Sequence, residues 1–209
     1  KILEIILKKY SSLLHPNLLF TQIRNVHSKE YLKDDFESLG FKHKSHLNFI
    51  LNLEEGEDFV WMNMNKKRRN SIKKSTKFDI EIQSINNNED IEKSYKILKA
   101  VYSDRKMPLA DISLFLNSFK FLRNKGMISA FNTIFENQVI ATLWLLKYKN
   151  SYYDWYSASN SNFSYINPND SLIWFAIREA ISEGYNRFDF GGAGSPNESY
   201  GVRDFKKKF

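Results

Sequence analysis

A run of basic residues is the first part of this sequence whose composition suggests chemistry. Seven lysines and arginines and no acidic residue lie between Lys66 and Lys77. At helical spacing, one stripe of the run carries cations toward solvent: Lys66, Arg69, Lys73 and Lys77. A second stripe would dock the helix, mainly through its apolar members: Trp61, Met64, Arg68 and Ile72. We interpret the cationic stripe as a clamp for phosphate or carboxylate, with a solvated face of a lysine-rich protein as the alternative.

A glycine-rich turn near the carboxyl end is a second candidate. It consists of Gly191-Gly192-Ala193-Gly194 and follows a short buried strand predicted at 187–190. Glycines let a backbone approach a ligand closely, but the absence of a following Gly-Lys-Ser/Thr excludes a Walker loop. Asp189, near the end of the strand, could orient an amine or a hydroxyl, or it could cap the turn. The residues leave both roles open.

An aromatic strand surrounds a carboxylate in the segment from Tyr152 to Tyr156. Strict alternation would place Tyr152, Asp154 and Tyr156 on one face and Tyr153 with Trp155 on the other. The first face is then either a polar, partly wet surface or the polar side of an ordinary core strand.

Several kinds of site are excluded by what the sequence lacks. Without cysteine there is no disulfide framework, thiolate metal site or cysteine nucleophile, which fits a reducing compartment such as the cytoplasm. His43 and His46 have no carboxylate partner at ligand spacing, so we predict no metal site. No apolar run approaches the roughly 18 residues that span a bilayer, although the sequence is compatible with peripheral contact with a membrane.

The net charge points to one place in the chain. The 209 residues include 31 basic and 24 acidic side chains, for a formal charge of +7. Outside the run from Lys66 to Lys77 the two signs balance, so we expect one local anionic partner. A hydrophobic fraction of 42% is too high for a disordered chain. Because the first residue is lysine, we expect the natural start to lie upstream.

An alternation of helices and strands has to position these residues. The periodicity predicts helices at 2–14, 30–39, 59–76, 91–103, 111–124 and 171–183. It predicts strands at 18–26, 46–53, 79–85, 127–135, 139–148, 151–157 and 187–190. The strands between 127 and 157 are joined by short turns and are therefore expected to be antiparallel. The predicted fold class is mixed α/β (α+β), without the strict alternation of a doubly wound sheet.

Three motifs occur in an order that resembles a known family. The first is Trp61 followed by the basic helix with Ile72-Lys73-Lys74, and the second is Tyr102-Ser103-Asp104-Arg105-Lys106-Met107-Pro108. The third is Phe188-Asp189-Phe190-Gly191-Gly192, followed by Gly201-Val202-Arg203-Asp204-Phe205-Lys206. Together they are similar to the FemAB-like branch of the GNAT acyltransferase superfamily, whose best-known members add amino acids from aminoacyl-tRNA to peptidoglycan precursors.

The resemblance implies a fold, a domain division and a reaction. The fold would be a GNAT-like twisted, mostly antiparallel sheet flanked by helices. Residues 1–56 would be the remainder of a first GNAT-like subdomain, and residues 57–209 the acyltransferase domain. The reaction would be acyl transfer to an amine of a cell-envelope or polysaccharide precursor. The acyl donor would lie in a cleft beside splayed central strands at 139–148 and 151–157.

The resemblance also implies roles for individual residues. The Phe205-Lys206 pair matches the family's motif near the reacting end of the donor, where Lys206 would stabilise the oxyanion of a tetrahedral intermediate. Further candidates for moving a proton or orienting a substrate are Asp189, Tyr156 and Tyr200. The residues expected to bind substrate are Lys66, Arg69, Lys73, Arg105, Tyr200 and Phe205. No general base can be assigned from the sequence.

The acyl donor stays open between aminoacyl-tRNA and acyl-CoA, and no permanently bound cofactor is expected. Acetyl-CoA-using members of the wider superfamily have glycines in the turn that corresponds to 165–170, and this turn contains none. The usual backbone nest for a CoA pyrophosphate is therefore missing, which favours a tRNA-linked or other donor. No insertion is long enough for the helical arm that tRNA-dependent relatives often carry. The acceptor would be a phosphorylated or nucleotide-linked small molecule. The alternative reading is a non-catalytic nucleic-acid-binding or scaffold domain that uses the basic helix 66–77.

Overall fold

The computed structural model describes residues 2–13, 17–23, 30–197, 199 and 201–209. The chain divides into two compact units, residues 1–46 and 47–209, which are described separately. In the first unit the described residues form α1 (Ile2–Ser12), the short 3₁₀ helix η1 (Glu30–Leu32) and α2 (Lys33–Ser38). The strand predicted at 18–26 is wrong for residues 18–23, which are not in a strand, and its last three residues lie outside the described residues.

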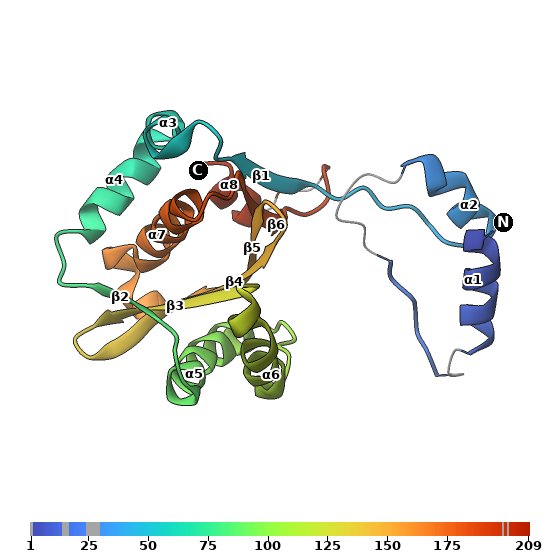
Figure 1. The fold of residues 1–209 in the computed structure, drawn as a ribbon, viewed down its shortest axis with the longest axis horizontal. Helices are drawn as coiled ribbons and strands as arrows, with labels where there is room; N and C mark the ends of the chain where they lie inside the picture. Colours follow the sequence, from blue (N-terminus) through green and yellow to red (C-terminus); the bar gives the residue numbers. More distant parts are fainter. Residues whose placement is uncertain (1, 14–16, 24–29, 198, 200) are drawn as a thin grey trace. The chain divides into compact units, whose positions relative to one another are not determined.

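The second unit is built on one six-stranded sheet (Figure 1). Its strands are β1 (Asn48–Asn52), β2 (Glu81–Ser84), β3 (Ile128–Phe135), β4 (Gln138–Tyr148), β5 (Ser151–Ser159) and β6 (Arg187–Gly192). Their order is β1-β6-β5-β4-β3-β2; β5 and β6 are parallel, and the other neighbours are antiparallel. Because β1 pairs with β6, residues 48–52 belong to this sheet, although they precede the domain boundary predicted at residue 56.

Helices cover both faces of the sheet. They are α3 (Gly56–Asn63), α4 (Lys66–Ser75), α5 (Asn88–Asp104), α6 (Ile112–Leu122), α7 (Pro168–Ser182) and α8 (Gly201–Lys206), with the 3₁₀ helices η2 (Arg123–Lys125) and η3 (Ser161–Ile166). Figure 1 shows α5 and α6 on one face, and α3, α4, α7 and α8 on the other. This arrangement confirms the predicted mixed α/β class and the mostly antiparallel sheet flanked by helices. No helix among the described residues is long and apolar enough to cross a membrane.

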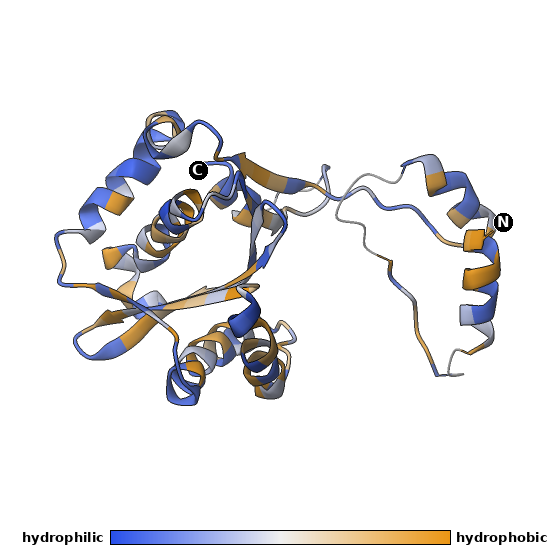
Figure 2. Ribbon diagram, viewed as in Figure 1, coloured by the Kyte–Doolittle hydropathy of each residue, from blue (hydrophilic) through white to orange (hydrophobic). Residues whose placement is uncertain are grey.

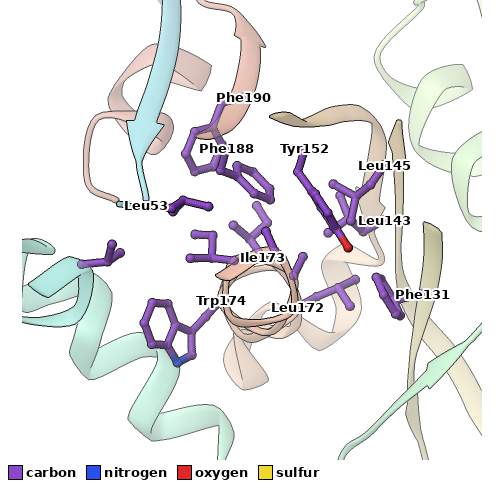
Figure 3. Packing of buried hydrophobic residues seen from close by; sticks show 14 of the residues in the cluster. Leu53, Phe131, Leu143, Leu145, Tyr152, Leu172, Ile173, Trp174, Phe188 and Phe190 are labelled. Atoms are coloured by element: carbon purple, nitrogen blue, oxygen red, sulfur yellow. The ribbon is translucent and has the colours of Figure 1, made fainter. Parts of the chain in front are cut away.

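Two apolar clusters attach the helices to the sheet. The cluster beneath α7 joins that helix to β4, β5 and β6 (Figure 3), and includes Leu172, Ile173, Leu143, Leu145, Tyr152, Phe188 and Phe190. The cluster beneath α5 and α6 is rich in aromatic rings: Phe115, Phe119, Trp144, Trp155 and Tyr156. Each large apolar side chain that becomes fully buried contributes about 1.5–3 kcal/mol to folding. Both faces of β5 are therefore held in place by packing.

The basic run forms a helix, as predicted, but this helix is separate from the residues before it. Figure 2 shows α4 as a largely hydrophilic helix. Met64, between α3 and α4, has an extended backbone (φ −61°, ψ 143°). Asn65 then caps α4, because its side-chain oxygen accepts a hydrogen bond from the N–H of Lys67 at 2.9 Å. The single helix predicted over 59–76 is therefore wrong.

Candidate functional site

β5 and β6 are parallel neighbours that pair over only three residues each. Ser151–Tyr153 pairs with Arg187–Asp189, although β5 continues to Ser159 and β6 to Gly192. Beyond these residues the two strands diverge, and among the described strands each keeps a partner only on its outer side, β4 for β5 and β1 for β6. A divergence of this kind leaves backbone polar groups in the middle of a sheet, where a ligand can take the place of a strand.

The splayed pair is not the one expected from the sequence. Strands 139–148 and 151–157 are paired from one end to the other as β4 and β5. A short turn holds antiparallel neighbours together from their first residues. β5 and β6 are instead connected through η3 and α7, and such a crossover allows two parallel strands to separate at one end.

A β-bulge in β5 lies at the same level of the sheet. Trp144 pairs with Tyr156 and the next residue, Leu145, pairs with Asp154. Trp155 is therefore an additional residue on β5, with no partner of its own in this register. A bulge of this kind bends its strand and re-aims the side chains on either side of it.

Tyr156, a predicted catalytic residue, lies on the face that carries α5 and α6. Its ring centroid is 4.9 Å from that of Phe115 and 5.9 Å from that of Tyr102, and burial raises its pKa. Tyr152 belongs instead to the cluster beneath α7. The common face predicted for Tyr152, Asp154 and Tyr156 is therefore wrong, because the bulge interrupts the alternation.

Asp154 lies where the two strands separate. Its partner Leu145 belongs to the cluster beneath α7, which places the Asp154 side chain on the face of α7 and α8. Burial raises the pKa of Asp154 to about 6, the charge of Asp189 adds to this rise, and Lys206 opposes it. A carboxyl group that titrates near neutral pH is suited to accept a proton. Sequence reasoning assigned Asp154 no role, and its one signal was a carboxylate within an aromatic strand.

Lys206, predicted to be catalytic, reaches the same place from α8. Its Nζ donates hydrogen bonds to the carbonyl oxygen of Gly192, at 2.8 Å, and to that of Phe190. Burial lowers the pKa of Lys206, while the charges of Asp154 and Asp189 act in the opposite direction. An ammonium group has three donors, so the two bonds to β6 leave one for another acceptor.

Asp189, also predicted to be catalytic, is held by two hydrogen bonds. Its Oδ1 accepts the backbone N–H of Gly191 at 2.7 Å and the side-chain amide of Asn48 at 2.8 Å. Gly191 has φ +70°, and a Cβ there would lie 3.2 Å from the hydroxyl of Tyr153. These contacts match the turn-capping alternative, because Asp189 fixes the turn at the end of β6. The carbonyl oxygens that accept hydrogen bonds from Lys206 belong to the same segment.

Arg68 is the second residue whose importance sequence reasoning missed. Its guanidinium forms a buried ion pair with Asp170 of α7 and donates to the carbonyl oxygen of Phe205 at 3.0 Å. The rings of Phe205 and Phe209 lie 4.0 and 4.4 Å from its Cζ. Burial lowers the pKa of Arg68 and raises that of Asp170, and their mutual attraction opposes both shifts. Arg68 therefore ties α4, α7 and α8 together and positions the residue next to Lys206.

Arg69, a predicted substrate-binding residue, caps α3. Its Nη1 donates to three carbonyl oxygens at the end of that helix: Trp61 at 3.2 Å, Met62 at 2.7 Å, and Met64. Satisfying the last carbonyls of a helix is a structural role. Lys66 and Lys73, predicted on the same stripe, are exposed.

The remaining predicted residues are spread over the molecule. Phe205 stacks on Arg68, as described above, and lies beside Lys206. Arg105 is exposed and follows the last residue of α5, so it lies on the opposite face of the sheet from α4 and α8. Tyr200 lies outside the described residues. The structure thus brings together Lys206, Phe205 and Asp189, but not Arg105.

The start of α7 is poorly suited to an anion. Asn167 has a left-handed backbone (φ 59°), and Pro168 begins the helix without an N–H to offer. The N–H groups of Asp170 and Ser171 both bond to the carbonyl oxygen of Asn167, at 3.1 and 3.4 Å. The carboxylate of Asp170 is buried at the same end. A helix N-terminus binds phosphate through free N–H groups and positive potential, and both are reduced here.

Two cavities lie away from the divergence. One, of about 250 Å³, is between α3 and α7 and is lined by Glu57, Asp58, Trp61 and Trp174. The other, of about 320 Å³, is between α4, β2 and α7, with apolar walls that include Ile72, Ile82 and Phe175. No group of three acidic or histidine side chains within the described ranges could hold a metal ion. The candidate site is therefore defined by the strand divergence and the charged groups on it.

Comparisons with known proteins agree with this geometry. The family model of the acetyltransferase (GNAT) domain matches residues 63–207. Among solved structures, FemX has a TM-score of 0.72 at 15% sequence identity, over 86% of this chain and 64% of that one. The lysylphosphatidylglycerol synthetase L-PGS from Bacillus licheniformis has a TM-score of 0.60 at 12% identity, over 85% of this chain and 61% of that one.

A third structure, the C-terminal domain of a putative lysylphosphatidylglycerol synthetase from Agrobacterium fabrum, has a TM-score of 0.57 at 11% identity, over 78% of this chain and 52% of that one. This chain thus spans less than two thirds of the length of these structures. No curated protein sequence matches it. The chain belongs to the acetyltransferase (GNAT) domain family, and its fold is similar to that of FemX.

Proposed function

We propose that this chain transfers an aminoacyl group from aminoacyl-tRNA to an amine, at the point where β5 and β6 diverge. The observation that carries the proposal is that Lys206 and Asp154 are close enough at that point for their charges to interact. Lys206 has one N–H donor beyond its two bonds to β6, and Asp154 has a pKa of about 6. Both residues lie within the range 63–207 that the GNAT family model matches.

The chemistry requires one bond to form and one to break. The acceptor amine attacks the ester carbonyl carbon, a C–N bond forms, and the negative charge moves onto the carbonyl oxygen. Lys206 donates its remaining hydrogen bond to this oxyanion. Asp154 takes the proton that the amine loses, because its carboxylate is ionised above its pKa of about 6. Collapse of the intermediate breaks the C–O bond, and the ribose oxygen leaves as a hydroxyl with the proton that Asp154 had taken, which returns Asp154 to its ionised form.

The donor preference rests on the start of α7. A CoA donor carries a pyrophosphate that needs backbone N–H groups. Pro168 has no N–H, and the N–H groups of Asp170 and Ser171 are already bonded to the carbonyl oxygen of Asn167. The buried carboxylate of Asp170 adds negative charge at this end. An ester carried on the 3′ end of a tRNA has no pyrophosphate to place there. These contacts therefore favour aminoacyl-tRNA over acyl-CoA.

The acceptor class follows from the resemblance to the FemAB-like branch, with a phosphorylated or nucleotide-linked cell-envelope precursor as the substrate. We also propose that the first unit is the remainder of a first GNAT-like subdomain. Its apolar side chains are unusually exposed, with Leu19 at 93%, Ile2 at 77% and Phe20 at 74%. Exposed apolar surface of this kind marks a surface that another element covers.

A donor competition tests the proposal. The chain is mixed with a nucleotide-linked amine acceptor and either aminoacyl-tRNA or acetyl-CoA, and formation of the amide is measured. We expect amide from aminoacyl-tRNA, and a loss of about a hundredfold in rate for Lys206→Ala. Lys99→Ala, at an exposed lysine of α5, is the matched control and should keep the full rate. Equal use of acetyl-CoA would refute aminoacyl-tRNA as the preferred donor. An unchanged rate for Lys206→Ala would refute the strand divergence as the reacting site.

A further inference from the structure

We propose that four lysines form one surface that binds the phosphate backbone of RNA next to the reacting site. The α4–α8 lysine surface consists of Lys66, Lys67, Lys207 and Lys208. The inference rests on the proposed function, because the RNA would be the acceptor end of the tRNA that carries the acyl group. It replaces the stripe along α4 that the sequence suggested, since Arg69 is engaged in capping α3.

Two hydrogen bonds between distant segments bring these lysines together. The N–H of Asn65, just before α4, donates to the carbonyl oxygen of Lys208 at 3.0 Å. The Arg68 guanidinium, one turn further, donates to the carbonyl oxygen of Phe205 at 3.0 Å. The first turn of α4 and the end of the chain are therefore adjacent, although they lie far apart in the sequence.

The four side chains are exposed, while their backbones are fixed. Lys66 and Lys67 occupy the first turn of α4, whose Asn65 cap binds the N–H of Lys67. The N–H groups of Lys207 and Lys208 bond to carbonyl oxygens of α8, at 2.9 and 3.3 Å. A fixed backbone holds the charges at one place, and free ammonium groups can adapt to a ligand.

The arrangement carries uncompensated positive charge. Within the described part of the chain, no acidic side chain forms an ion pair with any of the four lysines. The first turn of α4 contains no acidic residue, and its two lysines stand at the positive end of the helix dipole, where cations are unfavourable. Lys208 acts on Asp170, but that carboxylate is already paired with Arg68. Asp204 is the exposed acid on α8. The fold alone gives no reason for this cluster, whereas an anionic partner does.

An extended polyanion fits this surface better than a single enclosed phosphate. Both described cavities lie elsewhere, between α3 and α7 and between α4, β2 and α7, so these lysines line an open surface. The surface also begins one residue after Lys206. With the ester carbonyl at Lys206, the phosphates of the terminal nucleotides would run across the neighbouring lysines, each contact adding to affinity and to its salt dependence.

Binding of an uncharged RNA tests the inference without any transfer step. The probe is a fluorescent hairpin with the acceptor stem of a tRNA and a single-stranded 3′ end, titrated with the chain at several salt concentrations. The variants are Lys66→Ala with Lys67→Ala, and Lys207→Ala with Lys208→Ala. The control is Lys96→Ala with Lys99→Ala, which removes the same charge from exposed positions of α5 on the opposite face.

We expect each surface pair to weaken binding about tenfold and to lower the slope of log affinity against log salt by about one to two. The control should leave both values unchanged, and all variants should keep the wild-type melting temperature because the four side chains are exposed. Equal losses in the control and the surface variants would overturn the inference, because binding would then follow net charge alone. Absence of any RNA binding by the wild-type chain would also overturn it.

A short donor separates this inference from the proposed function. An aminoacyl ester of adenosine carries no backbone phosphate, so the surface variants should use it as well as the wild type does. Transfer from the short donor without RNA binding would refute the proposed RNA-binding surface and would leave the proposed aminoacyl transfer standing. RNA binding with the expected losses, but no transfer from either donor, would keep the surface and refute the function.

Discussion

Two carboxylates on the same face of the sheet have opposite surroundings. Asp170 is buried in α7 and forms an ion pair with the guanidinium of Arg68. Asp154 lies on β5 at the strand divergence, with its pKa raised to about 6 and a lysine nearby whose hydrogen bonds go to carbonyl oxygens. Burial raises the pKa of both groups. The difference is that Asp170 is paired with Arg68, which joins α4, α7 and α8, whereas Asp154 forms no ion pair among the described residues and can exchange a proton.

The largest expected effect is on activity at Asp154. Asp154→Asn removes the proton acceptor but keeps the size of the side chain, so we expect the rate of amide formation to fall about a thousandfold. The initial rate under saturating donor measures this. Asp170→Asn, as the comparison, should lose far less activity at a temperature where it remains folded. A similar loss in both variants would erase the distinction between the two carboxylates.

The next largest effect is on stability at Arg68. Arg68→Met leaves Asp170 buried without its cation, so we expect the free energy of unfolding to fall by about 3 kcal/mol. Urea denaturation measures it. Arg68→Lys should rescue little, because an ammonium group cannot contact the rings of Phe205 and Phe209 and bind two acceptors as a planar guanidinium does. Full rescue by lysine would show that only the charge matters.

A smaller effect of opposite sign is expected for the stability of Asp154→Asn. The carboxyl ionises near pH 4 in the unfolded chain and near pH 6 in the folded one, so its ionisation lowers the stability of the wild type as the pH rises through this window. Asparagine has no such cost, so the variant should be more stable by roughly 2–3 kcal/mol at pH 8 and about equal at pH 4. Thermal unfolding at both pH values checks this. A variant that is less stable at pH 8 would mean that the ionised carboxylate is stabilised in place.

The smallest effect is expected at Arg69. Its guanidinium caps three carbonyl oxygens of α3, so Arg69→Ala should cost about 1 kcal/mol of stability. Binding of the RNA hairpin should stay close to the wild-type value at a temperature where the variant is folded. A loss of RNA affinity as large as that of the lysine-surface variants would return Arg69 to a binding role.

Much of the fold was predictable, because it depends on local patterns. The meander from β3 to β5 is confirmed because alternation and short turns specify each hairpin. The Phe205-Lys206 motif predicts that Lys206 lies near the reacting end of the donor, but the strands expected to splay were 139–148 and 151–157 and not β5 and β6. The separation of α3 from α4 was not predictable from periodicity, because it depends on the capping contacts of Asn65 and Arg69.

The site itself was predictable only in part, because its decisive features are contacts between distant segments. Arg68 lies 102 residues from its partner Asp170, so helical spacing showed only a cation within an apolar stripe. Asp154 was assigned to the same face as Tyr156, and the bulge that separates them is a property of the pairing with β4. The divergence of β5 from β6 likewise depends on tertiary structure, because the two strands are parallel and are connected through η3 and α7.

The pH dependence of kcat/KM for amide formation shows whether Asp154 takes the proton of the acceptor amine. With wild-type chain and aminoacyl-tRNA, we expect an acidic limb with an apparent pKa of about 6, where Asp154 becomes ionised. In Asp154→Asn this limb should disappear, and the remaining low rate should follow only the ionisation of the acceptor amine. An unchanged limb near pH 6 in Asp154→Asn, or a wild-type rate in that variant, would show that Asp154 is not the proton acceptor.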